Sequence, residues 1–374
     1  MEVKKTRLEE LEILRGIAFL AVVLQHAFAG IFILPNISST ELTIGATLLG
    51  IIRFAVPLFV FITGVVLFYN YDGKINYIQF INKRFVQVII PYITWTLFYY
   101  VWISFLSGFS PSSTWLEIVK IFKLIFTGEA SYHLWFMVMI IPFYLLFPIF
   151  RLLMSKERKY LTNFAVVISI FIINIFMLFA LSKDMIQYSN DSFIFFFNYL
   201  DRNFIFWTFY FILGGFVGLY YGKWKNFVNK FIIFCVVFLA VYLYFVYIEI
   251  KNINLIESNY LLSAQITDPL KPITMLAATT SIIIIFFFAQ KLLSRYTIIT
   301  KYLKVFGEFS FGAYLIHAFV LRFTNDFVIN HLSIISPFAQ TFVSFVLCSV
   351  FSLALCYLIS KVKIPTGEIV VGKV

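Results

Sequence analysis

The chain has 374 residues, of which 61% are hydrophobic and only 13% are charged, and its mean hydropathy is +0.93. These values exclude a soluble globular domain and indicate an integral membrane protein. The net charge of +11 does not indicate a nucleic-acid partner, because the basic residues lie in short clusters between apolar stretches, the pattern that sets membrane topology. We therefore expect an all-α, polytopic transmembrane helical bundle that forms one domain over residues 1–374.

Apolar windows long enough to cross a bilayer as helices occur about ten times, at residues 11–34, 45–69, 85–107, 133–154, 161–182, 203–222, 227–249, 272–290, 305–323 and 338–360. A cytoplasmic N-terminus places most of the 29 basic residues on the cytoplasmic side, so both termini are predicted to be cytoplasmic. Three connections stand out: residues 115–126 are amphipathic and suit the membrane interface, and the loops 183–202 and 250–271 carry polar residues suited to sugar contact.

The first apolar stretch contains an arginine and a histidine at helical spacing. Arg15 and His26 are eleven positions apart. At 100° per residue, eleven steps return a side chain to within about 20° of its starting direction, roughly 16 Å along the axis. A cation and an imidazole on one face are costly in lipid, so such groups usually face a bundle interior or a wet cavity and mark a substrate path. The alternative is that His26 only hydrogen-bonds a neighbouring helix.

Arginines also interrupt the second span and open the third. Arg53 lies near the outer end of its span, where it either meets a partner or snorkels to the headgroups. Pro57 and Gly64 further along allow a kink or close helix packing. Lys83 and Arg84 begin the third span from the cytoplasmic side. This pair either only follows the positive-inside rule or forms a phosphate clamp, for which a guanidinium is well shaped.

Two further spans carry polar side chains at membrane depth. His133 and Trp135 begin the fourth span, and tryptophan there is an ordinary interfacial anchor. The ninth span brings an acid, a phenol and a second intramembrane imidazole onto one helix, at Glu308, Tyr314 and His317. The last two share a helical face.

The cysteines give no sign of a disulfide framework or a metal site. Cys235, Cys348 and Cys356 fall inside predicted spans, and no CxxC spacing is present. We expect them to be packing residues and expect no bound metal.

Four motifs follow one another along the chain: Leu14-Arg15-Gly16-Ile17 with His26 eleven positions after Arg15, Val56-Pro57-Leu58-Phe59 followed by Thr63-Gly64, His133-Leu134-Trp135-Phe136, and Ser310-Phe311-Gly312-Ala313-Tyr314-Leu315-Ile316-His317. With these motifs in this order, the chain resembles the acyltransferase family 3 integral membrane proteins over nearly its whole length. Two positions depart from the family pattern: Gln87 stands where a second arginine often follows Arg84, and Glu12 stands where aspartate is common. The layout is similar to stand-alone members such as the polysaccharide intercellular adhesin modification and export proteins.

The resemblance implies a membrane O-acyltransferase that moves an acyl group, commonly acetyl, from cytoplasmic acyl-coenzyme A (acyl-CoA) to a cell-surface or lipid-linked glycan. It also implies that acyl-CoA is a donor substrate rather than a permanently bound cofactor. The expected partners are the glycan acceptor and membrane lipids, and the expected location is the cell membrane of a bacterium, as a multi-pass protein.

Roles for individual residues follow from the same resemblance. Arg15, Lys83 and Arg84 are expected to bind the phosphates of acyl-CoA on the cytoplasmic side. His26 is expected to act as general base on the acceptor hydroxyl or to carry the acyl group itself.

The other predicted site residues complete the two substrate contacts. Arg53 would stabilise the oxyanion or hold the acceptor. The expected catalytic set is His26, Arg15, Arg53 and His317, and the expected substrate-binding set is His133, Trp135 and Tyr314.

Two other classes of function remain open. A transporter or exporter of polysaccharide or small molecules would use the same central cavity without thioester chemistry, and hydrolysis of acyl-CoA by the purified protein separates it from the enzyme. A structural membrane protein is the third reading, and it explains the intramembrane Arg and His poorly.

Overall fold

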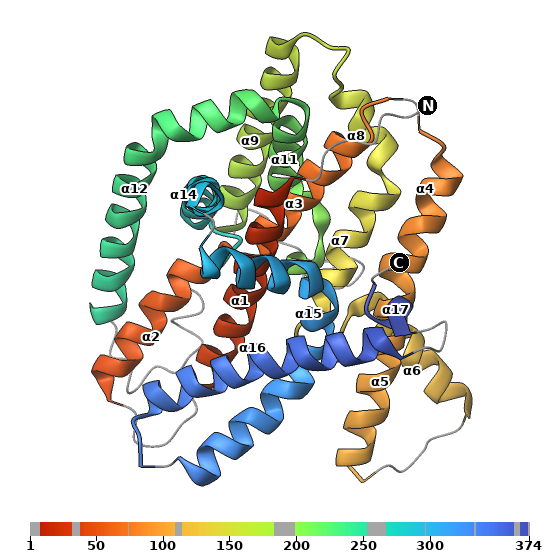
Figure 1. Ribbon diagram of the computed structural model, residues 1–374, viewed down its shortest axis with the longest axis vertical. Helices are drawn as coiled ribbons and strands as arrows, with labels where there is room; N and C mark the ends of the chain where they lie inside the picture. The colour runs from red at the N-terminus through yellow and green to blue at the C-terminus, as the bar shows by residue number, and fades with distance from the viewer. Residues whose placement is uncertain are drawn as a thin grey trace.

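The computed structural model describes residues 8–31, 38–73, 75–108, 114–182, 199–252, 267–295, 297–332, 334–362 and 367–372. Within these ranges all regular structure is helical (Figure 1), which confirms the predicted all-α bundle. In chain order the helices are α1 (Glu9–Ile31), α2 (Ser39–Ile52), α3 (Ala55–Asn70), α4 (Tyr77–Arg84), the π-helical η1 (Phe85–Ile89), α5 (Ile90–Leu106), α6 (Thr114–Thr127), α7 (Trp135–Leu145), α8 (Phe147–Leu153), α9 (Tyr160–Ser182), the 3₁₀ turns η3 (Leu200–Arg202) and η4 (Phe204–Trp207), α11 (Thr208–Leu219), α12 (Tyr221–Asn252), α14 (Pro272–Arg295), α15 (Ile298–His331), α16 (Pro337–Lys361) and α17 (Gly367–Val370).

The described residues form a multi-pass membrane protein. Eight helical stretches among them are long and apolar enough to cross a membrane, and the bent pair α7 and α8, which meet at 59°, makes nine. The predicted window 203–222 corresponds to the shorter apolar stretch Phe204–Leu219. Each predicted window therefore overlaps a helix, whereas ten membrane crossings and two cytoplasmic termini stay predictions. The loops 183–202 and 250–271 lie largely outside the described residues.

The second predicted span is divided into two helices. α2 ends at Ile52 and α3 begins at Ala55. Pro57 has no N–H to donate to the carbonyl of Arg53 four residues earlier, so the helical hydrogen-bond ladder is interrupted there. The interruption leaves Arg53 at a helix end, in the interior of a stretch that would otherwise be a continuous span.

The centre of the bundle is the crossing of α1 and α15. α1 lies in the middle of the molecule (Figure 1) and contacts α2, α3, α14, α15 and α16. A Cβ on Gly16 would overlap the backbone oxygen of Leu303, and a Cβ on Gly307 would overlap the carbonyl of Glu12. Only glycine allows two helix backbones to approach this closely. The contact holds Arg15 beside the polar residues that follow Gly307 in α15.

α3 and α11 meet in the same way. A Cβ on Gly64 would overlap the carbonyl oxygen of Phe211, and a Cβ on Gly214 would overlap that of Phe61. The close packing predicted at Gly64 is therefore confirmed, and it holds α3 against the rest of the bundle.

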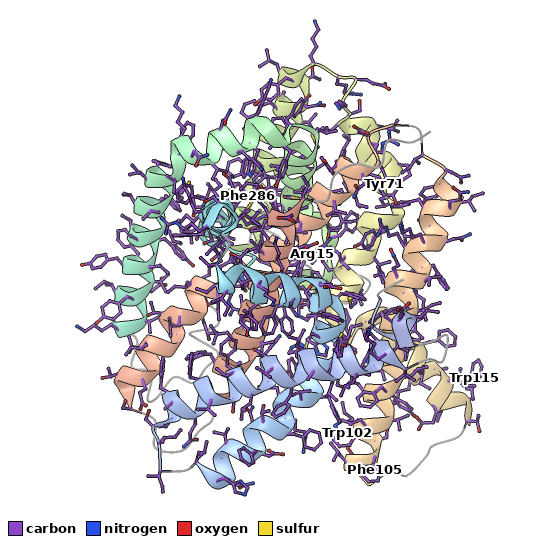
Figure 2. All side chains as sticks on the ribbon, viewed as in Figure 1. Arg15, Tyr71, Trp102, Phe105, Trp115 and Phe286 are labelled. Carbon is purple, nitrogen blue, oxygen red and sulfur yellow. The ribbon has the colours of Figure 1, made fainter. Side chains whose placement is uncertain are left out.

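The outer surface of the bundle is apolar. Phe105 and Trp115 are 74% and 71% exposed and point away from the bundle, whereas Phe286 is fully buried (Figure 2). Exposed large apolar side chains of this kind suit a lipid-facing surface. The amphipathic stretch predicted at residues 115–126 lies within helix α6.

Candidate active site

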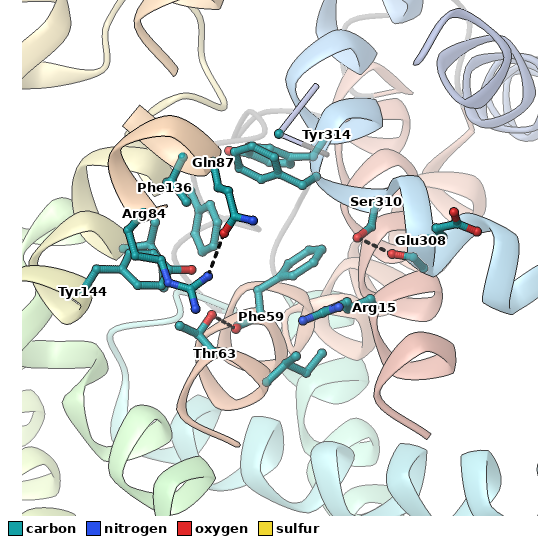
Figure 3. Close-up of a pocket in the computed structure, with 16 residues that line it drawn as sticks. Arg15, Phe59, Thr63, Arg84, Gln87, Phe136, Tyr144, Glu308, Ser310 and Tyr314 are labelled. Atoms are coloured by element: carbon teal, nitrogen blue, oxygen red, sulfur yellow. Dashed lines mark hydrogen bonds between the residues drawn. The ribbon is translucent and has the colours of Figure 1, made fainter. Parts of the chain in front are cut away.

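A polar cavity of about 330 Å³ opens beside the crossing of α1 and α15. Two arginines line it, so we call it the arginine cavity (Figure 3). Its polar walls come from α1, α3, the α4–η1 junction and α15, and its full lining is Arg15, Phe59, Ile62, Thr63, Arg84, Gln87, Val88, Phe136, Ile140, Tyr144, Gly307, Glu308, Ser310, Phe311, Tyr314 and Gly372. Arg15 and Arg84 enter it from opposite sides (Figure 3).

Arg84 is fixed by an amide and by aromatic rings. Its Nη1 donates a hydrogen bond to Gln87 Oε1 at 3.2 Å, and its guanidinium carbon lies 5.4 Å from the centre of the Phe80 ring and 5.5 Å from that of Tyr144. Gln87 belongs to the π-helical turn η1. Pro91, in the following helix α5, has no N–H to donate to the Gln87 carbonyl, so the regular α-helical hydrogen bond is missing there. The position that departs from the family pattern therefore orients the arginine that precedes it.

The chain's four histidines divide into three that meet and one that does not. His26 of α1, His133 of the turn before α7 and His317 of α15 form what we call the histidine cluster. The ring centres of His26 and His317 are 5.3 Å apart, and those of His133 and His317 are 4.7 Å apart. His331 is exposed at the end of α15. His26 therefore faces the bundle interior, and its place on a substrate path stays a prediction.

Hydrogen bonds fix the tautomer of His317 and the position of Tyr314. The Nδ1 of His317 contacts the backbone carbonyl of Tyr314, and because a carbonyl only accepts, Nδ1 carries the proton of the neutral ring. The Tyr314 hydroxyl donates to the His133 carbonyl. The Tyr99 hydroxyl donates to the Leu315 carbonyl at 2.8 Å. α15 is thereby tied to α5 and to the turn before α7 at the level of the cluster.

A second cavity, of about 400 Å³, lies on the other side of the cluster. His26 lines it, so we call it the His26 cavity. α15 contributes Ala318, Leu321, Arg322 and Asn325, which follow the i, i+3, i+4, i+7 spacing of one helical face. The remaining lining residues are Ala29 of α1 and Tyr132.

The same two helices line both cavities. α1 contributes Arg15 to the arginine cavity and His26 to the His26 cavity. α15 contributes Tyr314 to the first and Ala318 to the second, with His317 between them in the chain. The histidine cluster therefore lies between two separate cavities, each of which carries an arginine in its lining.

Arg53 lies near the cluster rather than in either lining. Its Nε donates to Thr267 Oγ1 at 3.3 Å, and it is close enough to His26 to interact electrostatically with that ring. This supports the alternative in which Arg53 meets a partner inside the bundle.

Two residues that the sequence assigned to the site lie elsewhere. Lys83 is exposed on α4 and does not line the arginine cavity. Trp135 lines neither cavity, and its ring centre lies 5.8 Å from that of Trp207.

Glu308 lines the arginine cavity but is an exposed residue. Among the described residues no group of three His, Cys, Asp or Glu side chains has a metal-holding arrangement.

Sequence reasoning missed several residues that line the cavities, among them Tyr132, Arg322, Asn325 and Gly372. Arg322 and Asn325 continue the polar face of α15 beyond His317, so helical spacing could have found them. Tyr132 is the neighbour of a predicted site residue. Gly372 belongs to the C-terminal segment, which is held by a hydrogen bond from Trp95 Nε1 to the Val370 carbonyl at 3.2 Å, and no pattern in the sequence signalled it.

Comparisons with known proteins give a family and a set of relatives. A family model described as "Acyltransferase domain" matches residues 8–361. The "Probable poly-beta-1,6-N-acetyl-D-glucosamine export protein" of Staphylococcus aureus strain Mu50 is 25% identical over 334 residues, which cover 87% of each chain. The proteins of the same name from strains MSSA476 and MRSA252 are each 24% identical with the same coverage. No solved structure matches the chain.

Proposed function

Because the chain belongs to the acyltransferase domain family, we propose that it is a membrane O-acyltransferase that moves an acyl group, acetyl in the first instance, from cytoplasmic acyl-CoA to a hydroxyl of a cell-surface or lipid-linked glycan. The observation that carries the proposal is the position of three imidazoles between two separate cavities. One cavity suits the donor, the other suits the acceptor, and the imidazoles lie where the acyl group has to pass.

The arginine cavity is proposed to bind the donor. Guanidinium groups bind phosphates through charge-assisted, bidentate hydrogen bonds, and Arg15 and Arg84 approach the cavity from opposite sides (Figure 3). Its volume of about 330 Å³ falls within the range of small-molecule pockets. The phosphates would lie at the arginines, and the pantetheine arm would extend past Tyr314 towards the histidine cluster.

His26 is proposed to carry the chemistry at the acceptor. As a general base it takes the proton of the acceptor hydroxyl while the hydroxyl oxygen bonds to the acyl carbon and the carbon–sulfur bond breaks. As a covalent carrier its nitrogen first takes the acyl group, which then passes to the hydroxyl. In either route Arg53 stabilises the negative charge that develops on the acyl oxygen.

The His26 cavity is proposed to bind the acceptor. Tyr132 offers an aromatic ring, and Arg322 and Asn325 offer planar hydrogen-bonding groups, which together suit a sugar with several hydroxyls. The relatives are named for poly-beta-1,6-N-acetyl-D-glucosamine, so a polysaccharide of the bacterial cell surface is the proposed acceptor class and the plasma membrane the proposed location.

The relatives' names also keep export as a second candidate. A polymer pathway needs a continuous opening, whereas the two cavities here have separate linings and the cluster's side chains lie between them. This arrangement favours passage of a small group over passage of a chain.

The decisive experiment uses the purified protein in lipid nanodiscs with radiolabelled acetyl-CoA and a poly-N-acetylglucosamine oligosaccharide. We expect thiol release together with an alkali-labile acetyl ester on the sugar. An export protein without acyl chemistry would give neither product, yet it would move the oligosaccharide across the membrane of proteoliposomes. That pair of results would overturn the proposal.

A further inference from the structure

Two nitrogens of the histidine cluster have no hydrogen-bond partner in the described part of the chain, Nε2 of His133 and Nε2 of His317. Of these two residues, only His317 neighbours both a residue of the arginine cavity and the ring of His26. His317 is fully buried, its Nδ1 is engaged by the Tyr314 carbonyl, and its Nε2 is a buried atom without a partner. Leaving a buried polar atom unpaired destabilises a folded protein, so such an atom calls for a functional explanation. In the tautomer fixed by Nδ1, the Nε2 lone pair of His317 is available as a base.

His317 also stands between the two proposed substrates. Its ring centre is 5.5 Å from that of Tyr314, which lines the arginine cavity. It is 5.3 Å from that of His26, which lines the His26 cavity. The two imidazoles are stacked, with 27° between their planes. Their nitrogens hydrogen-bond in the plane of each ring, so a proton would pass between the rings at their edges, through one bridging water molecule.

The proposed reaction creates two charges in an apolar interior. When the acceptor hydroxyl attacks, His26 gains a proton and becomes a cation. When the carbon–sulfur bond breaks, the sulfur keeps the electron pair and becomes a thiolate on the donor side. Separated charges are costly in a buried, apolar environment, so a group that carries the proton from one side to the other lowers the barrier.

His317 belongs to the catalytic set expected from the sequence, and we propose its specific role: it is the proton carrier that returns the acceptor's proton to the leaving thiolate. His26 passes its proton to Nε2 of His317, and the resulting imidazolium gives an Nε2 proton to the thiolate. The acceptor oxygen is then bonded to the acyl carbon, the sulfur bears the hydrogen, and both imidazoles return to their neutral forms. No further reactant is needed. This role rests on the proposed acyltransferase function.

The test compares two kinds of donor in a matched set of variants. In His317→Asn the side-chain amide keeps a donor near the Tyr314 carbonyl but removes the base at Nε2. His331→Asn makes the same change at the exposed histidine of the same helix. The donors are acetyl-CoA and an acetyl thioester of an aromatic thiol, whose thiolate leaves without needing a proton. Binding of CoA to each variant reports whether the fold and the donor cavity are intact.

We expect His317→Asn to bind CoA as the wild type does, to transfer acetyl from acetyl-CoA at least 10²-fold more slowly, and to recover most of the wild-type rate with the aromatic thioester. His331→Asn should match the wild type with both donors. Equal losses with both donors, or a near wild-type rate with acetyl-CoA, would overturn the proton-carrier role. If the wild-type protein itself transfers no acyl group from either donor, the proposed function fails instead.

Discussion

Two side chains of α1 mark the two ends of the proposed reaction path. Arg15 lines the cavity assigned to the donor and His26 lines the cavity assigned to the acceptor. Because they share a face of one rigid helix, their separation is set by the helix itself rather than by the packing of loops. At the scale of single residues, the site is therefore defined by the spacing of Arg15 and His26. A substitution at the Arg15 end should impair donor binding, and a substitution at the His26 end should impair acyl transfer.

Replacing His26 by alanine should abolish acyl transfer while leaving the protein folded. Removal of a general base or an acyl carrier costs more than about 10²-fold in rate. The measurement is ester formation on the acceptor by purified His26→Ala, with size-exclusion chromatography as the check of folding. A well-folded variant with nearly wild-type transfer would contradict the assignment of His26.

Replacing Arg84 should weaken the binding of acyl-CoA. A charge-assisted contact to phosphate is worth about 1.5–3 kcal/mol, which corresponds to a loss of roughly one to two orders of magnitude in affinity. Arg84→Lys should recover only part of it, because lysine keeps the charge but loses the planar fork. Calorimetric titration with CoA measures the effect, and Lys301→Ala, an exposed residue of α15, is the control.

The opposite pattern is expected on the other side of the cluster. His133→Ala and Arg53→Ala should leave donor binding largely intact and impair transfer to the glycan, because neither residue lines the arginine cavity. Donor affinity that survives in Arg84→Ala but is lost in His133→Ala would reverse the assignment of the two cavities.

At the scale of helices, the site depends on how closely α1 and α15 approach. The backbones meet at Gly16 and Gly307, so that a single added methyl group has no room. As a result, side chains next to this crossing line the same cavity: Arg15 of α1, and Ser310 and Tyr314 of α15. A change at the crossing therefore affects both stability and the geometry of the site.

Gly307→Ala should destabilise the protein. Forcing an additional carbon into a packed contact costs about 1–3 kcal/mol, because the added Cβ overlaps the Glu12 carbonyl. The matched control is Gly222→Ala on α12, where nothing lies within 4 Å of the added Cβ, and there alanine should be neutral or stabilise the helix by roughly 0.5–1 kcal/mol. Thermal unfolding in detergent compares the two. Equal Tm values would show that α1 and α15 are not in backbone contact.

At the scale of the whole molecule, the basic clusters predict which side of the membrane each loop faces. Reporter fusions should place residues 151–160 and 291–304 in the cytoplasm, and residues 183–202 and 250–271 outside, because basic loops are retained on the cytoplasmic side. A loop at 151–160 that is accessible only from outside would exclude the ten-span arrangement.

Local periodicity explains which features could be predicted from the sequence. The shared face of Arg15 and His26, the polar face of Tyr314 and His317, and the apolar windows are all properties of single helices. The meeting of His133 with His317 was not predictable, because it depends on a tertiary contact, the hydrogen bond from the Tyr314 hydroxyl to the His133 carbonyl. For the same reason the exposure of Lys83 and the distance of Trp135 from both cavities appear only in the folded chain.

The position of the histidine cluster between two cavities has an electrical consequence for the proposed reaction. The acyl group passes from sulfur to oxygen as the equivalent of a cation, and a proton passes from oxygen to sulfur in exchange. The two movements cancel, so no net charge crosses the membrane field, which would otherwise contribute about 2.3 kcal/mol per elementary charge per 100 mV. In proteoliposomes, a potassium diffusion potential should leave the rate of transfer unchanged. A rate that follows the potential would mean that a charged substrate traverses the field. If the exchange is electroneutral, a cell can acylate its surface at the same rate whether or not its membrane is energised.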